Sequence, residues 1–140
     1  MAQIVLDTDV VSLYRAGRLP AGPARQVVVN ESSVAFATAG ELWKWALTRR
    51  WGTARRGGLD LWLATATVLP AGLVTARTWA EITTGAQRRG RPRPLHDAWI
   101  AACCIESGLP LLTLNRRDFA DFAEHDGLVL LGNGTGAGPN

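Results

Sequence analysis

Four acidic side chains are the residues of this 140-residue sequence whose type and position best fit a chemical role: Asp7, Glu41, Asp97 and Asp118. Three of them follow segments that are predicted to be strands, and Asp97 begins a predicted helix. In open α/β sheets, functional groups gather beyond the carboxyl ends of the strands, so we expect the four side chains to meet. Each acid taken alone is explained equally well by helix capping or a turn. The set as a whole predicts an acidic cleft.

The chemistry of such a cleft follows from charge repulsion. Carboxylates gathered in one place raise one another's pKa unless a cation neutralises them. Oxygen ligands without an accompanying His or Cys cluster favour Mg²⁺ or Mn²⁺, which commonly bind together with a substrate phosphate. Such sites hydrolyse phosphodiester bonds, because one cation activates water and a second, where present, stabilises the leaving oxygen. The sequence leaves open whether one or two cations bind.

Strands and helices are predicted to alternate around these acids. We predict strands at residues 4–6, 33–36, 68–69, 111–114 and 128–131. We predict helices from Thr8 onward, from Glu41 to Trp51, at 59–66, at 76–87 and from Asp97 to Gly108. This alternation is typical of a single-domain α/β/α sandwich, in which helices cover both faces of a mostly parallel sheet of about five strands.

Length and composition predict one domain. With 140 residues, 47% of them hydrophobic, the chain is long enough for one core and too short for two ordinary domains. We assign residues 1–131 to this domain and residues 132–140 to a flexible, glycine-rich tail. The sequence has no apolar run long enough for a membrane span and no signal-peptide-like start, so we expect a cytoplasmic protein. The adjacent Cys103 and Cys104 are interpreted as buried thiols.

Arginine dominates the basic residues. The formal net charge is +3, and 14 of the 15 basic side chains are arginine, which suits bidentate phosphate contacts and favours a nucleic-acid partner. The candidates for RNA binding are the arginines close in sequence to the acids, namely Arg88, Arg89, Arg91 and Arg93 before Asp97, and Arg116 and Arg117 before Asp118. The alternative is that the first group forms a solvated loop and that the second pairs with Asp121 or Glu124.

Four motifs together resemble a known family. They are Asp7-Thr8-Asp9, Glu41-Leu42, His96-Asp97-Ala98-Trp99-Ile100-Ala101-Ala102, and Thr113-Leu114-Asn115-Arg116-Arg117-Asp118-Phe119. Their order and spacing resemble the PIN domain and, within it, the VapC-type toxin ribonucleases of type II toxin–antitoxin pairs. The resemblance spans nearly the whole chain, and the last two motifs are the most specific in combination.

The resemblance implies a role for each matched residue. Asp7 and Asp97 would be the primary metal ligands, with Glu41 and Asp118 completing the pocket directly or through water. Thr113 and Asn115 would orient these acids, whereas Asp9 is left with an accessory or capping role. The resemblance further implies cleavage of RNA with Mg²⁺ or Mn²⁺, toxicity to the host cell, and a cognate antitoxin whose arginine-bearing tail enters the acidic pocket.

The predicted helix from Glu41 to Trp51 has two apolar faces. Trp43, Leu47 and Trp51 form one stripe, and Leu42, Trp45 and Ala46 form the other. One face should meet the sheet, and the second is core, a contact in a homodimer or a groove for the antitoxin. We favour a partner surface, because exposed aromatic patches mark interaction sites, and we expect a homodimer.

Other functions were weighed against the same residues. The opening Asp7-Thr8-Asp9-Val10 also fits the haloacid-dehalogenase-like phosphatases, but Lys44 lies too early and no late Gly-Asp pair is present. A receiver domain is disfavoured as well, because this sequence has no lysine after its last predicted strand. A catalytically inactive, RNA-binding or regulatory PIN domain would be expected to lack some of the four acids. His96 is interpreted as a capping or packing residue, and His125 has no supporting neighbours in the sequence.

Overall fold

Four short parallel strands form the centre of the protein. The computed structural model describes residues 2–132 of the chain. The strands are β1 (Gln3–Leu6), β2 (Glu31–Ala35), β3 (Thr67–Leu69) and β4 (Leu111–Leu112). They lie in the order β3-β2-β1-β4, so that β1 and β2 are central. Val5 of β1 is opposite Ser33 on one side and Leu111 on the other.

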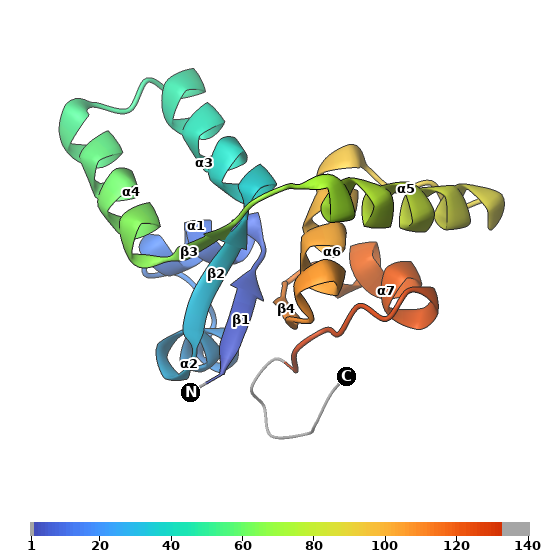
Figure 1. Ribbon diagram of the computed structural model, residues 1–140. Coiled ribbons are helices and arrows are strands. Elements are labelled where there is room, and N and C mark those ends of the chain that lie inside the picture. Colours follow the sequence, from blue (N-terminus) through green and yellow to red (C-terminus); the bar gives the residue numbers. More distant parts are fainter. Residues whose placement is uncertain (1, 133–140) are drawn as a thin grey trace.

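Seven helices connect and cover these strands within the described residues. They are α1 (Thr8–Arg15), α2 (Ala21–Val29), α3 (Phe36–Thr48), α4 (Thr53–Thr65), α5 (Leu73–Arg88), α6 (Leu95–Ser107) and α7 (Arg116–His125). Figure 1 shows α3 and α4 as a pair standing to one side of the sheet, with α5, α6 and α7 gathered on the other. The predicted α/β/α sandwich is confirmed.

Each face of the sheet has its own hydrophobic core. Side chains of β1 alternate between the two: Ile4 and Leu6 pack with residues of α1 to α4, whereas Val5 packs with residues of α5, α6 and α7. Helix α6 is buried on nearly all sides, which explains its run of Ala and Cys side chains. It ends at Gly108, whose φ of 69° is the left-handed conformation that favours glycine.

The strands are fewer and shorter than predicted. The fifth predicted strand, 128–131, is reduced to a single bridge between Leu130 and Leu111, and the predicted strand 111–114 ends at Leu112. The predicted strand 33–36 is shifted, because it begins at Glu31 and Phe36 already belongs to α3. Packing between neighbours sets these limits, and a single sequence shows only the local pattern.

The helices are longer than predicted. Helix α4 begins at Thr53 rather than at 59, and α5 begins at Leu73 rather than at 76. Helix α2 was not predicted, because its valines at 27–29 are β-branched and have low helix propensity.

Three other expectations bear on the described part of the chain. Cys103 and Cys104 are buried and free, as predicted, and burial raises the pKa of the Cys103 thiol to about 11. None of the helices between residues 2 and 132 combines the length and the apolar character that a membrane crossing requires. Of the predicted flexible tail, residues 133–140 lie outside the described residues.

Candidate active site

Asp7 lies at the carboxyl end of β1, and its side chain is fixed on both oxygens. Oδ1 accepts a hydrogen bond from the Thr8 backbone N–H at 2.8 Å, and Oδ2 accepts one from the Thr113 hydroxyl at 2.7 Å. Asp7 itself is therefore the N-cap of α1, rather than Asp9, for which a capping role was predicted. The side chain is buried, and burial raises its pKa, with a further contribution from Asp97.

Asp97 is the third residue of α6 and is half-buried in the same region. Burial raises its pKa first, and Asp118 and Glu41 raise it further. The repulsion shows that the first turn of α6 brings Asp97 close to acids from α7 and α3. Asp97 thus interacts electrostatically with each of the other three predicted acids, Asp7, Glu41 and Asp118.

Glu41 reaches this region from within α3, and the expectation that it follows a strand directly is wrong. Helix α3 begins at Phe36 without a loop after β2, which places Glu41 in the second turn. Its Oε1 lies 3.4 Å from Nε2 of His96. The same nitrogen lies 3.1 Å from the Thr8 hydroxyl, which is itself 3.1 Å from the hydroxyl of Thr38.

His96 therefore has a different place from the one predicted. The N-cap of α6 is Pro94, and His96 instead connects α6 with Thr8 of α1 and Glu41 of α3. These contacts join the first turns of α1 and α6 to the second turn of α3. The signal in the sequence was the position of His96 beside Asp97, but its partners lie 55 and 88 residues away.

Thr113 and Asn115 form a polar connection after β4. The Thr113 hydroxyl donates to Asp7 and accepts from the Asn115 backbone N–H at 3.0 Å. The Asn115 amide donates to Oδ2 of Asp9 at 2.7 Å. These bonds hold the loop before α7 against the first turn of α1, and so position Asp7 and Asp9 relative to Asp118.

Asp9 is the acid that sequence reasoning undervalued. It is half-buried beside Asp7, and burial together with the Asp7 charge raises its pKa to about 6. It also accepts a hydrogen bond from the Val10 backbone N–H, but as the second residue of α1 it is not the cap, which is Asp7. The signal for a further role was the spacing of two acids around Thr8, which a helix start alone explains equally well.

The donor chemistry fits a hard divalent cation. Asp7, Asp9 and Asp97 all have raised pKa values, which a cation bound among them would reverse. Carboxylate oxygens are the ligands that Mg²⁺ and Mn²⁺ prefer. In residues 2–132, however, no three His, Cys, Asp or Glu side chains already stand close enough together to hold an ion.

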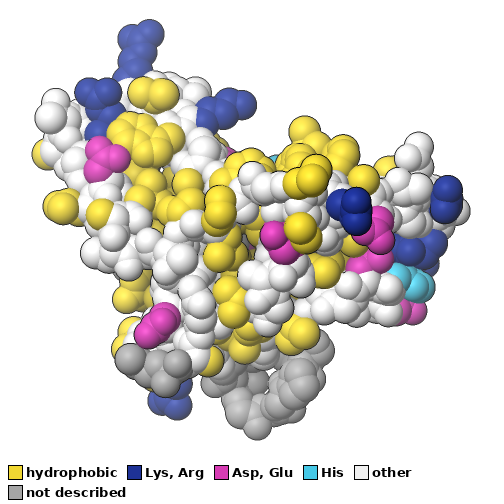
Figure 2. Space-filling model, viewed as in Figure 1, with side chains coloured by type: hydrophobic (Ala, Val, Ile, Leu, Met, Phe, Trp, Pro, Cys, Tyr) yellow, Lys and Arg dark blue, Asp and Glu magenta, His cyan; other side chains and the backbone are white. Residues whose placement is uncertain are grey.

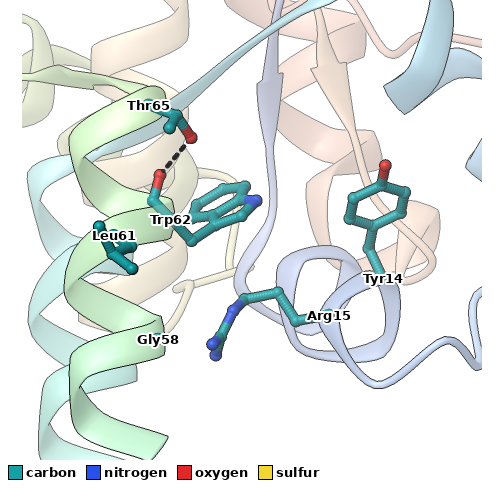
Figure 3. Close-up of a pocket in the computed structure, with 6 residues that line it drawn as sticks. All are labelled: Tyr14, Arg15, Gly58, Leu61, Trp62 and Thr65. Carbon is teal, nitrogen blue, oxygen red and sulfur yellow. Dashed lines mark hydrogen bonds between the residues drawn. The ribbon is translucent and has the colours of Figure 1, made fainter. Parts of the chain in front are cut away.

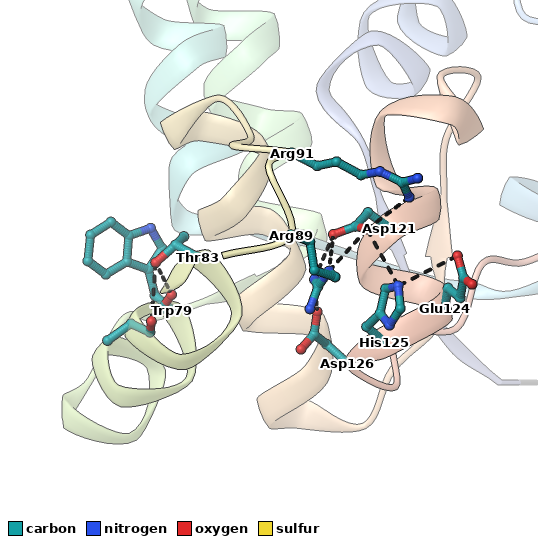
Figure 4. Close-up of polar contacts among 9 residues, drawn as sticks. Trp79, Thr83, Arg89, Arg91, Asp121, Glu124, His125 and Asp126 are labelled. Carbon is teal, nitrogen blue, oxygen red and sulfur yellow. Dashed lines mark hydrogen bonds and ion pairs between the residues drawn. The ribbon is translucent and has the colours of Figure 1, made fainter. Parts of the chain in front are cut away.

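The arginines predicted to meet RNA are not equivalent. Arg88 belongs to α5 and Arg89 caps its end, so neither lies in the predicted loop. Arg89 forms an ion pair with Asp121 at 2.6 Å and a longer one with Asp126 at 3.4 Å, as Figure 4 shows. Arg91 lies 3.5 Å from Asp121, but most of its side chain is exposed. Arg89 is thus held inside the protein by two carboxylates.

The two arginines before Asp118 differ from each other. Arg116 donates to the backbone carbonyl of Leu131 at 2.5 Å, and Arg117 is exposed. Asp121, which was suggested as a partner for these two, is instead paired with Arg89. His125 does have neighbours, since its Nε2 lies 3.7 Å from both Asp121 and Glu124.

The tryptophan-rich helix lies beside two hollows away from the acids. Leu42 and Ala46 are buried in the core, and Trp43, Trp45 and Trp51 pack against that core partly exposed. A pocket of about 270 Å³ between α1, α3 and α4 includes Trp45, Trp51 and three arginines among its lining. A larger hollow of about 650 Å³ lies between α1 and α4, where Figure 3 shows Trp62 and Arg15 pointing into the same space.

Comparison with known proteins identifies the family. Residues 4–125 match the model of the PIN domain, so the chain belongs to the PIN domain family, the family that its motifs resemble. This assignment replaces the phosphatase and receiver alternatives. A search of curated proteins finds no match.

Solved structures share the fold. A chain of VapBC-1 from nontypeable Haemophilus influenzae has 21% identity and a TM-score of 0.75, with 93% of this chain and 96% of that chain covered. A chain of VapBC2 from Rickettsia felis, bound to a promoter DNA fragment, has 18% identity and a TM-score of 0.76, covering 93% and 97%. A chain of VapBC-5 from Mycobacterium tuberculosis, a member of the VapBC family of toxin–antitoxin systems, has 25% identity and a TM-score of 0.67, covering 93% and 98%.

Proposed function

We propose that this PIN domain is an endoribonuclease that depends on Mg²⁺ or Mn²⁺ and serves as the toxin of a toxin–antitoxin pair. The observation that carries the proposal is the pair Asp7 and Asp97, which interacts with further acids and in which burial and the neighbouring negative charge raise both pKa values. Such a cluster is costly without a cation and suits one that binds a phosphodiester. An RNA substrate also agrees with the arginine-rich composition and with a cytoplasmic location.

In this proposal the residues divide the work by position. Asp7 and Asp97 hold the cation, and Glu41 and Asp118 complete its surroundings directly or through water. When bound, the cation would activate a water molecule and offset the charge of the scissile phosphate. Thr113 fixes the orientation of Asp7, and His96 keeps Glu41 beside the start of α1. Asn115 restrains Asp9, which is available as a further carboxylate.

The test is the cation dependence of RNA cleavage by the purified protein. We expect a single-stranded RNA to be cut with Mg²⁺ or Mn²⁺, to stay intact with EDTA, and to be cut again when Mn²⁺ is added in excess. Cleavage that persists in EDTA after extensive dialysis would show that the acids act without a metal. A protein that binds RNA yet never cuts it would instead support the inactive regulatory alternative.

A protein partner is supported by the surface of α4. Leu61 is 72% exposed at the edge of the hollow that Tyr14, Arg15 and Trp62 also line. Leu61 extends the apolar lining of this hollow into solvent, and a continuous apolar surface of this kind suits a protein partner. The similar solved structures are named as VapBC complexes, so we propose that a cognate antitoxin covers this hollow and sends an arginine-bearing tail to the acids.

The partner proposal is tested with the product of the adjacent reading frame. We expect co-expression to relieve toxicity and the two proteins to copurify, and Leu61→Asp to weaken copurification while leaving RNA cleavage unchanged. Exposed Val28→Asp on α2 is the matched control, because it adds the same charge away from the hollow. Equal copurification of both variants would place the antitoxin elsewhere.

A homodimer is proposed on a second apolar surface. Leu73 and Val74 at the start of α5 are 82% and 63% exposed, and Val68 of the edge strand β3 is 40% exposed. Figure 2 shows hydrophobic side chains gathered over this end of α5. We expect a dimer by sedimentation that Leu73→Asp converts to a monomer. A monomeric wild-type protein at micromolar concentration would remove the proposal.

A further inference from the structure

Arg93 differs from the other arginines near the acids in what surrounds it. One terminal nitrogen, Nη1, donates to the backbone carbonyl of Asp118 at 3.4 Å, which is a long hydrogen bond. Its Nε–H is buried and has no acceptor among the described residues. A guanidinium has five N–H donors and cannot lose its charge, so this arrangement leaves donor capacity without a partner.

The backbone holds Arg93 at one place between two site helices. Pro92 precedes it, and Pro94, the N-cap of α6, follows it, which restricts Arg93 to extended backbone. The start of the segment is anchored by the Arg89–Asp121 ion pair and by a hydrogen bond from the Arg91 backbone N–H to the carbonyl of Ala86 at 2.9 Å. The side chain is therefore presented to the first turns of α6 and α7, which carry Asp97 and Asp118.

The charge of Arg93 acts on the acidic cluster without being paired to it. Arg93 lowers the pKa of Asp97, but no ion pair within 4 Å joins it to Asp97 or Asp118 in the described residues. A cation bound by the acids would take up their negative charge and leave the guanidinium beside them with free N–H groups. The negative group of an RNA substrate that can pair with this guanidinium is a phosphate, which arginine binds through two parallel hydrogen bonds.

We propose that Arg93 binds a phosphate of the RNA substrate beside Asp97 and Asp118, which makes it the substrate-binding arginine among the six candidates. The inference rests on the proposed ribonuclease function. Arg89, by contrast, is neutralised by Asp121 and Asp126 and stiffens the segment that presents Arg93. Two of the six arginines predicted from the sequence therefore have distinct roles: Arg93 binds substrate, and Arg89 holds the backbone.

The experiment compares Arg93→Ala, Arg93→Lys and Arg25→Ala with the wild type. Arg25 is an exposed residue of α2, so its loss removes the same charge far from the acids. We expect Arg93→Ala to lower kcat/KM for single-stranded RNA by about 100-fold and Arg93→Lys by about 10-fold, because Lys keeps the charge and loses the bidentate geometry. Arg25→Ala should match the wild type.

A second readout separates phosphate binding from a structural role through Asp118. RNA affinity is measured by fluorescence anisotropy at several salt concentrations, with every variant carried in an Asp7→Asn background. The slope of log affinity against log salt should fall by about 0.7 for Arg93→Ala, the value for one phosphate contact on a single strand, and stay unchanged for Arg93→Lys.

Four results are possible. A fall in both kcat/KM and the salt slope supports the inference. Unchanged kcat/KM in Arg93→Ala, or a loss of kcat/KM with an unchanged salt slope, overturns it, and the second result would make Arg93 a support for α7 alone. Wild-type protein that does not cut RNA with any divalent cation contradicts the proposed function instead. Phosphate binding by Arg93 is then tested separately, by the salt slope of RNA binding.

Discussion

Two buried aspartates in this protein have opposite electrostatic surroundings. Asp7 and Asp121 are exposed to nearly the same small extent, 5% and 6%. Arg89 lowers the pKa of Asp121 through hydrogen bonds and charge, whereas burial and Asp97 raise the pKa of Asp7. Burial alone therefore does not tell the two apart, and the neighbouring charges do.

The difference shows which carboxylate is structural and which is available for chemistry. Asp121 has its countercharge within the protein, from Arg89 and Arg91, with His125 beside it (Figure 4), and joins the end of α5 to α7. Asp7 is held by neutral donors, Thr8 and Thr113, which orient it but leave its charge uncompensated. An external cation is expected to bind most favourably beside a carboxylate such as Asp7, whose negative charge the fold does not neutralise.

Adding Mn²⁺ should produce the largest change in stability. A cation that binds only the folded protein raises its free energy of unfolding by about 2.7 kcal/mol at 100 times the dissociation constant. We expect this gain in thermal unfolding for the wild type and for Asp121→Asn, and its loss in Asp97→Asn. A gain of equal size in Asp97→Asn would place the metal away from the acids.

Asp121→Asn should produce the next largest effect in the absence of metal. The change removes the charge of the closer partner of Arg89 and leaves the longer contact to Asp126 as its remaining ion pair among the described residues, so we expect a loss of about 2 kcal/mol in the free energy of unfolding, below the range for fully buried pairs because Arg89 is partly exposed. Asp7→Asn should cost little, since Asn also caps helices and carries no charge. Urea unfolding with EDTA measures both, and equal losses would abolish the distinction between the two aspartates.

The pH dependence of stability should have opposite signs for Asp9, which lies beside Asp7, and for Asp121. Asp9 has a pKa raised from 3.8 to about 6, so its contribution is present below pH 4 and is lost as pH rises toward 6. Asp121 has a lowered pKa, so its contribution is present above pH 4 and is lost as pH falls further. Thermal unfolding in EDTA should show the loss between pH 4 and 6 diminished in Asp9→Asn and kept in Asp121→Asn. Identical profiles for the two variants would contradict the assigned pKa directions.

Arg91→Ala should have the smallest effect. Its contact with Asp121 is 3.5 Å long and its side chain is 64% exposed, and exposed ion pairs contribute about 0.5 kcal/mol or less. A loss in urea unfolding as large as that of Arg89→Ala would mean that Asp121 depends on both arginines equally.

The fold and the order of the acids were accessible from the sequence because both follow local patterns. The alternation of strands and helices predicts a parallel sheet, and a parallel sheet predicts that Asp7 and Asp118 meet at one edge. Asp97 is placed by the helix that precedes β4. Glu41 was placed at the end of a strand, because nothing local shows that α3 begins immediately after Ala35.

The side-chain partners were not accessible, because they come from distant parts of the chain. Arg89 and Asp121 are 32 residues apart, and His96 and Thr8 are 88 apart. Asp9 was assigned an accessory or capping role, and Arg93 was one of six arginines that the sequence could not rank as RNA-binding candidates. What distinguishes them is their neighbours in space, which separate one arginine from another and one aspartate from another.

The most direct test of the acidic site compares RNA cleavage by three aspartate variants. Asp7→Asn and Asp97→Asn should each lower the Mn²⁺-dependent rate by about 1,000-fold, roughly 4 kcal/mol of transition-state stabilisation, while keeping the folded circular dichroism spectrum. Asp60→Asn, on the exposed face of α4, should cleave as the wild type does. Asp7→Asn or Asp97→Asn protein that cleaves at the wild-type rate would contradict the account.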